Sequence, residues 1–237
     1  MTHFINCPRS VTGSTLQRIS IYTNFIFDVI IIIVAEYKII FEDDSILVVN
    51  KPAGMLTVPT PKKERHTLSS LLNAYPGHRL DRETSGLILF AKNRQIQQAL
   101  MDAFKEKRVK KRYIALVQGK LERKNATISK PVQDNPYSLA KHAITQYRLL
   151  EERKGFSVVE VIPLTGRTNQ IRIHFKRIGH PLVGERRFAF AKDFPIKFRR
   201  TALHCADLEF EHPVTKKEMS FHCDLPMDMR SFLAAHK

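Results

Sequence analysis

The sequence predicts an α+β fold with a mixed, mostly antiparallel central sheet and flanking helices. Apolar runs typical of strands follow one another through short polar connections, as at residues 38–41 and 46–49 around the acidic turn 42–45. Short connections of this kind join antiparallel strands. Residues 93–104 instead repeat apolar side chains with the period of an amphipathic helix. The 237 residues can bury a sizeable core, and residues 35–237 contain no linker that would divide them.

Further helices and strands are expected after the opening hairpin. Residues 67–74 predict a short helix with its leucines inward, and residues 87–91 are purely apolar, which predicts a buried strand. Asn93 is a good N-cap for the amphipathic helix. Alternation over residues 113–117 predicts a strand with Tyr113, Ala115 and Val117 on one face, and Gly119 ends it.

Hairpins dominate the expected second half. Residues 120–141 are polar and are expected to be rich in loops. Residues 143–150 and 156–164 predict an antiparallel hairpin because their connection is short. A second hairpin is predicted from residues 202–210 and 219–223. A closing helix is indicated by three later apolar residues, Met229, Phe232 and Leu233.

Residues 165–178 are compatible with a helix or a strand. Thr168 can cap a helix whose apolar side chains recur every three or four residues, and Gly179 can end it. Alternating apolar residues would also fit a strand. The helix is preferred because both the cap and the stop fit. Arg167 and Arg172 would then lie near its N-terminal end, where backbone donors are free for an anion.

The charge balance indicates a polyanionic partner. Lys and Arg total 39 against 23 Asp and Glu, a formal net charge of +16. Such a balance favours nucleic acid or an acidic membrane surface, although a merely soluble basic protein is the alternative. Cys7, Cys205 and Cys223 show no paired spacing, which indicates a reducing, cytoplasmic location. Motifs that bind metals or dinucleotides are missing, so neither metal nor cofactor is expected.

Residues 1–34 differ from the rest and are treated as an N-terminal extension of residues 35–237. The apolar run 25–34 is interrupted by Asp28 and is shorter than the about 20 residues of a membrane span. The preceding segment also lacks the features of a signal peptide. An added β-strand and an artefactual upstream extension of the reading frame are both open.

The candidate site lies in a polar loop before the buried strand 87–91. Residues 78–86 read His-Arg-Leu-Asp-Arg-Glu-Thr-Ser-Gly, and loops held by a rigid scaffold often carry chemistry. Asp81, flanked by Arg79 and Arg82, is the candidate catalytic acid. The alternative is an ordinary polar turn in which Asp81 caps backbone groups.

A basic segment follows the predicted helix 93–104. Six of the eight residues 105–112 are Lys or Arg. Cations suit the C-terminal end of a helix, but six exceed what capping needs, so a phosphate-facing ridge is preferred. The ridge residues are Lys107, Arg108, Lys110, Lys111 and Arg112.

Several motifs, in order, resemble those of the RluA-type pseudouridine synthases. The three main ones are Lys51-Pro52-Ala53-Gly54, His78-Arg79-Leu80-Asp81 with Thr84-Ser85-Gly86, and Thr165-Gly166-Arg167-Thr168 with Gln170-Ile171-Arg172. Residues 111–115 resemble the family's tyrosine motif, and residues 179–184, 203–204 and 212–213 fit as well. The resemblance covers roughly residues 37 to 225. Asn169 departs from the family's usual His but can still donate a hydrogen bond, and no S4-type domain precedes residue 37.

The resemblance implies isomerisation of a uridine in ribosomal or transfer RNA to pseudouridine, after the base is flipped out. It implies that Asp81 is the catalytic aspartate and that Arg172 keeps this carboxylate ionised, since a lone buried carboxylate would tend to protonate. Tyr113 would stack on the uracil and act as the base at C5, unless it is an ordinary core aromatic. Arg79 would fill the space that the base leaves, unless it contacts a phosphate or Glu83.

The remaining expectations concern partners and competing functions. Arg167, the basic ridge and the clusters 176–177, 186–187 and 197–200 are expected to contact RNA. The protein is expected to act as a monomer, without a membrane or an obligate protein partner. Two other functions are conceivable: a catalytically idle RNA-binding or RNA-folding factor, and a glycosidase, which would need a second carboxylate such as Glu83.

Overall fold

A single mixed sheet of ten strands organises the protein. The structure is a computed structural model that describes residues 21–26, 29–34, 37–134, 137, 139–189 and 194–236, with side chains from residue 37 onward. The strands of the sheet are β3 (Lys38–Glu42), β4 (Ile46–Lys51), β5 (Tyr75–Pro76), β6 (Ser85–Ala91), β7 (Lys110–Gln118), β8 (Asn125–Ser129), β9 (Ile144–Arg153), β10 (Phe156–Pro163), β11 (Leu203–Glu211) and β12 (Glu218–His222). The helices are α1 (Leu68–Leu72), α2 (Arg94–Lys105), α3 (Gln170–Arg177) and α4 (Met227–Ala235).

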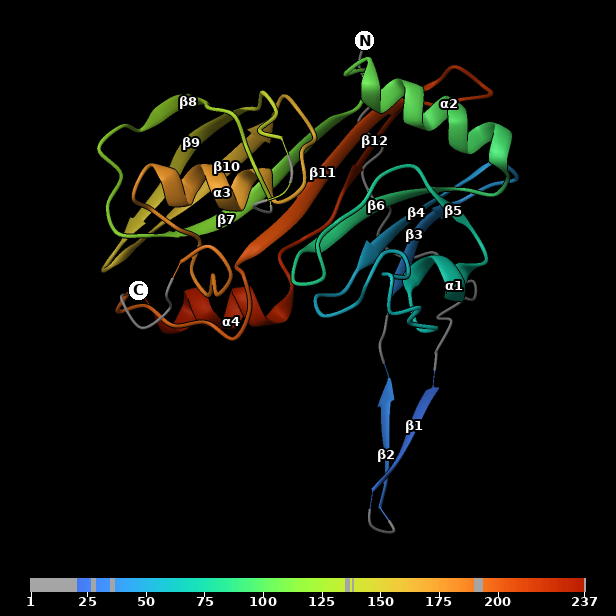
Figure 1. Ribbon diagram of the computed structural model, residues 1–237, viewed down its shortest axis with the longest axis horizontal. Helices are drawn as coiled ribbons and strands as arrows, with labels where there is room; N and C mark the ends of the chain where they lie inside the picture. The colour runs from blue at the N-terminus through green and yellow to red at the C-terminus, as the bar shows by residue number, and fades with distance from the viewer. Residues whose placement is uncertain are drawn as a thin grey trace.

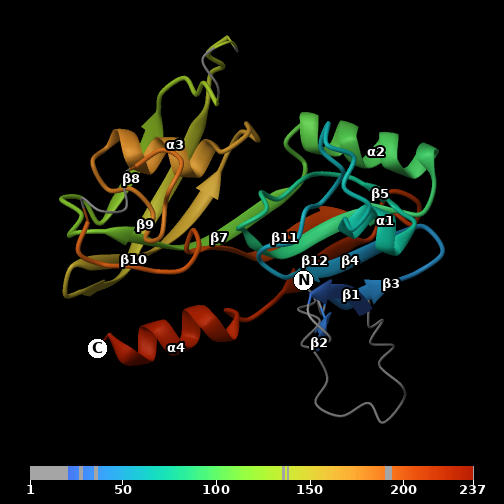
Figure 2. The ribbon, with the colours of Figure 1, turned by 60° about the horizontal axis from the view of Figure 1, so that its bottom comes forward.

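The sheet has the strand order β3-β4-β6-β11-β7-β10-β9-β8, with β5 beside β6 and β12 beside β11. All these pairs are antiparallel except β6 with β11. The mixed, mostly antiparallel α+β fold is therefore confirmed. Figures 1 and 2 show β8 to β10 with α3 on one side and β3 to β6 with α1 and α2 on the other, joined by β7 and β11.

The parallel contact between β6 and β11 depends on a glycine. Gly86 pairs with Cys205 and has a φ of 113°. A Cβ at Gly86 would lie 2.2 Å from the Cys205 carbonyl oxygen, so no other residue fits without moving one strand. The close approach fixes where β6 begins, directly after the loop that carries Asp81.

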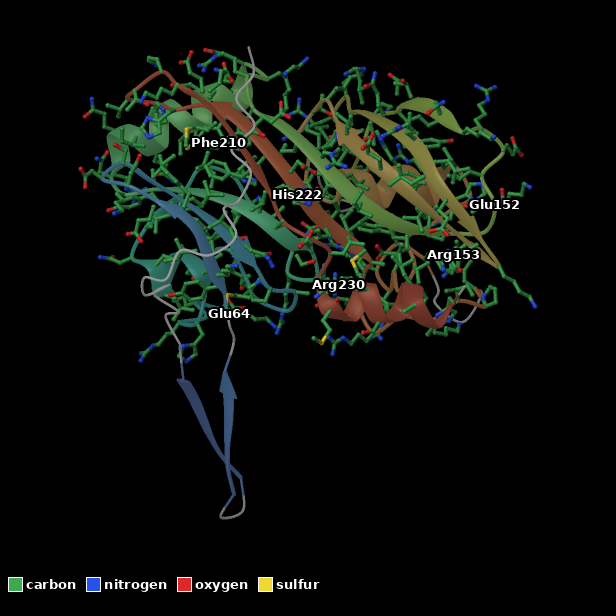
Figure 3. All side chains as sticks on the ribbon, turned by 180° about the vertical axis from the view of Figure 1, so that it is seen from behind. Glu64, Glu152, Arg153, Phe210, His222 and Arg230 are labelled. Carbon is green, nitrogen blue, oxygen red and sulfur yellow. The ribbon has the colours of Figure 1, made fainter. Side chains whose placement is uncertain are left out.

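The two faces of β7 pack into different cores. Tyr113, Ala115 and Val117 belong to the larger core, as their alternation predicted. Ile114 and Leu116 point to the opposite face, where they pack with residues of α4. The closing helix is thus confirmed. Arg153 on β9 also donates hydrogen bonds to carbonyls at the end of α4, and Figure 3 shows it from behind.

Most predicted elements of the second half are confirmed, with two corrections. The loop-rich interpretation of residues 120–141 missed β8, which pairs with β9 along its whole length. The helical interpretation of residues 165–178 was right about α3 but wrong about its cap. Asn169, not Thr168, occupies the N-cap position, in a left-handed conformation with a φ of 55° and without a capping side-chain hydrogen bond.

The N-terminal segment forms a separate hairpin. Strands β1 (Ile21–Ile26) and β2 (Val29–Val34) pair antiparallel with each other, apart from the ten-stranded sheet. Residues 1–20, including Cys7, lie outside the described residues. The assignment of residues 1–34 as an extension stays a prediction. Among the described helices, none is long and apolar enough to cross a membrane.

Candidate functional site

A buried lysine supports the loop that carries Asp81. Lys51 ends β4 with 0% of its surface exposed. Its Nζ donates to the carbonyl oxygens of Pro52, Met55 and Arg82 at 2.9, 2.8 and 3.2 Å. An ammonium group has three donors, so each donor has an acceptor. Burial lowers the pKa of Lys51 to about 7, although the charge of Asp81 opposes this shift.

Further hydrogen bonds fix the loop on either side of Asp81. The Gly54 amide donates to the Arg82 carbonyl at 2.8 Å, and the Thr57 hydroxyl donates to the Leu80 carbonyl at 3.0 Å. The Thr84 amide donates to the carbonyl of Asp81 itself at 3.1 Å. The backbone of Asp81 therefore has little freedom to move.

The end of the loop is held from the C-terminal part of the chain. Arg200, which is buried, donates from Nη1 to the Glu83 carbonyl at 3.0 Å and from Nη2 to the Ser85 hydroxyl at 3.3 Å. Its Nε and Nη2 pair with the Asp228 carboxylate at 2.7 and 3.0 Å. Asp228 belongs to α4, so this helix supports the loop through Arg200.

The structure brings Asp81 and Arg172 together. Arg172 Nη1 lies 3.4 Å from Asp81 Oδ2, and 29% of the Asp81 side chain is exposed. Arg172 is only 8% exposed and forms shorter bonds with Glu185, at 2.7 Å from Nε and 2.8 Å from Nη2. Burial acts to lower the pKa of Arg172, but the hydrogen bonds and charges of Glu185 and Asp81 outweigh it and raise that pKa. The guanidinium is a permanent cation beside a reachable carboxylate.

Tyr113 lies on β7, close enough to Asp81 for the charge of that carboxylate to affect its pKa. It is buried and is the register partner of Cys205 on β11. Burial is the largest cause that raises its pKa well above the ordinary value, and Cys205 and Asp81 add to the effect. The phenol therefore keeps its proton at neutral pH, and removing a proton from a substrate would require a change in this environment.

The predicted basic residues fall into two groups. The exposed group contains Arg79, Lys107, Arg108, Lys110 and Arg167.

The second group, Lys111 and Arg112, is partly buried. Lys111 Nζ lies 5.3 Å from the centre of the Phe104 ring, and burial lowers its pKa. Arg112 forms ion pairs with Glu160, at 3.1 Å, and with Asp207. The charge of Arg112 is therefore already balanced within the sheet, so its guanidinium is not presented as part of an open ridge.

Several residues of the site were missed by sequence reasoning. Lys51 was noted only as part of a motif, and Arg200 was grouped with the surface clusters expected to contact RNA, which is wrong because it is buried. Glu185 directly follows the matching stretch 179–184, and this position was the only sequence feature that could have identified it. Asn169 was expected to donate a hydrogen bond, but its Oδ1 accepts one from Arg172 at 2.7 Å.

Comparisons with known proteins point to one family. Residues 45–177 match the family model described as RNA pseudouridylate synthase. The chain is 36% identical over 220 residues to the uncharacterized RNA pseudouridine synthase YlyB of Bacillus subtilis, and the match covers 84% of this chain and 72% of that protein. It is 33% identical to the dual-specificity RNA pseudouridine synthase RluA of Vibrio vulnificus, covering 84% of this chain and 88% of that protein.

Solved structures show the same architecture. The human RNA pseudouridylate synthase domain containing 1 aligns with a TM-score of 0.66 and 27% identity, covering 81% of this chain and 84% of that chain. The human RNA pseudouridylate synthase domain containing 4 aligns with a TM-score of 0.70 at 21% identity, which supports the fold alone.

Proposed function

Because the chain belongs to the RNA pseudouridylate synthase family, and is therefore an isomerase, we propose that it converts specific uridines of ribosomal or transfer RNA to pseudouridine with Asp81 as the catalytic aspartate. One observation carries the role of Asp81. Its carboxylate is partly exposed and lies 3.4 Å from the buried Arg172 guanidinium. A nearby cation favours the ionised form of a carboxylate, and the exposed part can reach a substrate.

The reaction needs little from the protein beyond this carboxylate and a shaped site. The bond between N1 of the base and C1′ of the ribose breaks, the base turns, and a bond forms between C5 and C1′. The proton at C5 leaves and N1 gains one, so atoms and charges balance. Nothing is oxidised or hydrolysed, and the chemistry calls for neither a redox cofactor nor a metal.

Arg79 and Tyr113 have supporting roles in this proposal. The target base must leave its stack, at a cost of a few kcal/mol. Arg79 is exposed beside Asp81 and would occupy the vacated space. Tyr113 would stack on the uracil and take part in proton removal at C5. Its raised pKa means that it first has to lose its own proton, or that it orients another acceptor.

The exposed basic residues would hold the RNA backbone. Lys107 and Arg108 follow α2, Lys110 begins β7, and Arg167 precedes α3; all four are exposed. Phosphate contacts of this type give an affinity that falls steeply with salt. The names of the relatives support RNA as the substrate, since they include ribosomal large subunit and dual-specificity RNA enzymes.

We also place the enzyme in the cytoplasm as a monomer without an obligate protein partner. Cys205 and Cys223 are buried free thiols, which fits a reducing compartment. The glycosidase alternative named Glu83 as its second carboxylate, and this residue is supported by its position in the sequence alone. Glu185, the other carboxylate that shares Arg172 with Asp81, is buried and engaged in hydrogen bonds, so it is not free for that role.

The test is a map of pseudouridines in ribosomal and transfer RNA from cells with and without the gene. We expect one or more sites to disappear and to return when the wild-type gene is restored. Asp81→Asn should not restore them, although the purified variant should fold and bind RNA as before. An unchanged map in the deleted strain would refute the function, and restoration by Asp81→Asn would refute the role of Asp81.

A further inference from the structure

The donors of Arg172 are divided unequally among three acceptors. Nε and Nη2 bind the two oxygens of Glu185 at 2.7 and 2.8 Å, and Nη1 binds Asn169 Oδ1 at 2.7 Å. Asp81 receives the longest contact, 3.4 Å, from the same Nη1. The guanidinium is therefore anchored by Glu185 and Asn169 and only approached by Asp81.

Glu185 is itself fixed by the backbone. Its side chain is 1% exposed. Its Oε1 accepts hydrogen bonds from the amides of Arg186, Arg187 and Phe188 at 3.0, 2.8 and 3.2 Å. Burial acts to raise the pKa of Glu185, but Arg172 and the amides of Arg187 and Phe188 outweigh it and keep that pKa below the ordinary value. The carboxylate is an immobile anion that determines where the planar guanidinium lies.

Asn169 accepts the hydrogen bond from the third nitrogen of the guanidinium, Nη1, and does so from an unusual backbone conformation. Its φ of 55° and ψ of 18° lie in the left-handed region, which asparagine adopts more readily than most residues. The conformation directs Oδ1 to Nη1 of Arg172, one turn along α3. Asn169 is 7% exposed, so this contact is shielded from water.

We propose that Glu185 and Asn169 are positioning residues that keep Arg172 from closing on Asp81. The inference rests on the proposed role of Asp81. A guanidinium and a carboxylate that have no other partners frequently form a short bidentate pair, which would occupy both oxygens of the carboxylate that the reaction uses. Because Glu185 and Asn169 engage the donors of Arg172, the guanidinium supplies a positive charge to Asp81 and leaves the carboxylate free to contact the substrate.

Asn169→Gly tests this inference with little effect on the backbone. Glycine tolerates a positive φ, so only the acceptor oxygen is lost. The matched control is Asn73→Gly, because Asn73 is also left-handed, with a φ of 49°, but is an exposed cap of α1. The substrate is ribosomal and transfer RNA from cells that lack the gene. The readouts are the single-turnover rate of pseudouridine formation, the Kd for the same RNA and the Tm.

We expect Asn169→Gly to slow the single-turnover reaction about 10- to 100-fold, because a small displacement of a catalytic group has effects of that size. The Kd should stay unchanged, and Asn73→Gly should react at the wild-type rate. Asn169→Asp keeps an oxygen at this position and should recover much of the lost rate. An Asn169→Gly variant as fast as Asn73→Gly would overturn the inference, as would a lower Tm with an unchanged rate.

Glu185→Gln is the second variant. It preserves size but removes the charge that competes with Asp81, so the rate should again fall while the Kd is retained. A wild-type rate in this variant would remove Glu185 from the inference. The failure of the proposed function is distinguishable from these outcomes, because the wild-type protein itself would then form no pseudouridine.

Discussion

Arg172 Nη1 lies 3.4 Å from Asp81 Oδ2 although 91 residues separate them in the chain. Asp81 comes from the loop before β6, and Arg172 comes from α3, which follows β10. These two strands are separated in the sheet by β11 and β7. The contact therefore forms only when both halves of the sheet are folded, so the catalytic site depends on the whole sheet.

Arg172→Ala should lose both activity and stability. It leaves the buried Glu185 without its cation, and removing one partner of a buried ion pair costs about 3–5 kcal/mol. Asp81→Asn should lose activity with a much smaller change in stability, because the pair of Arg172 and Glu185 remains. Urea unfolding and pseudouridine formation are measured for both. Near-normal turnover of Arg172→Ala would mean that another residue supports Asp81.

Lys51→Met tests the buried lysine under the Asp81 loop. The pKa of Lys51 falls from 10.5 to about 7 in the folded protein, so between these values the unfolded chain holds more protons than the folded one. The wild-type free energy of unfolding should therefore rise with pH across this window relative to Lys51→Met. Urea unfolding of both proteins at the two ends of the window measures the difference. Parallel pH profiles would contradict the lowered pKa.

The same substitution should also affect the reaction. Without Lys51 the carbonyls of Pro52, Met55 and Arg82 lose a shared donor, and the loop that carries Asp81 loses its support. We expect a lower rate of pseudouridine formation with little change in RNA affinity. Faster amide hydrogen exchange in residues 80–84 would show that the loop has loosened.

His204 should make the protein sensitive to acid. Burial lowers its pKa from 6.5 to about 4, and its ring nitrogens lie 3.0 Å from the Ser85 hydroxyl and 3.2 Å from the Cys223 carbonyl. Between pH 6.5 and 4 the unfolded chain binds a proton that the folded chain does not, so stability should fall as the pH falls through this window. His204→Gln should show a smaller loss, as measured by thermal unfolding at several pH values. An equal loss in both proteins would assign the effect to other groups.

Sequence patterns predicted the elements well because periodicity reflects burial. The alternation of Tyr113, Ala115 and Val117 gave the correct face of β7, and Asn93 caps α2 through the Ile96 amide as expected. β8 was missed because its exposed pattern has a single buried residue, Ile128, and its position depends on pairing with β9. An apolar repeat in the sequence cannot reveal a strand that is stabilised mainly by pairing with a neighbouring strand.

The site was harder to predict because charge does not indicate burial. Motif resemblance supplied Asp81 and Arg172, whose contact the structure shows. It could not show that Arg200 faces inward to Asp228 or that Arg112 is already paired with Glu160. A basic residue in sequence can be a surface contact or a buried support, and only the surrounding carboxylates distinguish the two.

RNA binding should distinguish the exposed basic side chains from Arg112, whose charge is balanced by two carboxylates within the sheet. Lys110 has an ion pair of its own with Glu209 at 3.6 Å, but both of these side chains are exposed. Lys107→Gln and Lys110→Gln should each weaken binding about uniformly across RNA sequences and reduce the slope of log affinity against log salt by about 0.7, as for one lost contact to single-stranded phosphate. Arg112→Gln is the matched control. It should leave the slope unchanged and lower the Tm, because it breaks ion pairs with Glu160 and Asp207. A reduced slope in Arg112→Gln would place that residue on the RNA.

Removal of the N-terminal segment should leave a folded, active enzyme if residues 1–34 are an extension. Strands β1 and β2 pair with each other in a sheet of their own, so the ten-stranded sheet should not need them. A chain that starts at Ala35 should keep the wild-type Tm and rate of pseudouridine formation. A chain that starts at Lys38 is the contrast, because it also loses Tyr37, which is 4% exposed and belongs to the larger core. Loss of a large aromatic core side chain costs about 3–5 kcal/mol, so the Tm of this shorter chain should fall. Unfolding of the chain that starts at Ala35 would instead show that the hairpin supports the catalytic domain.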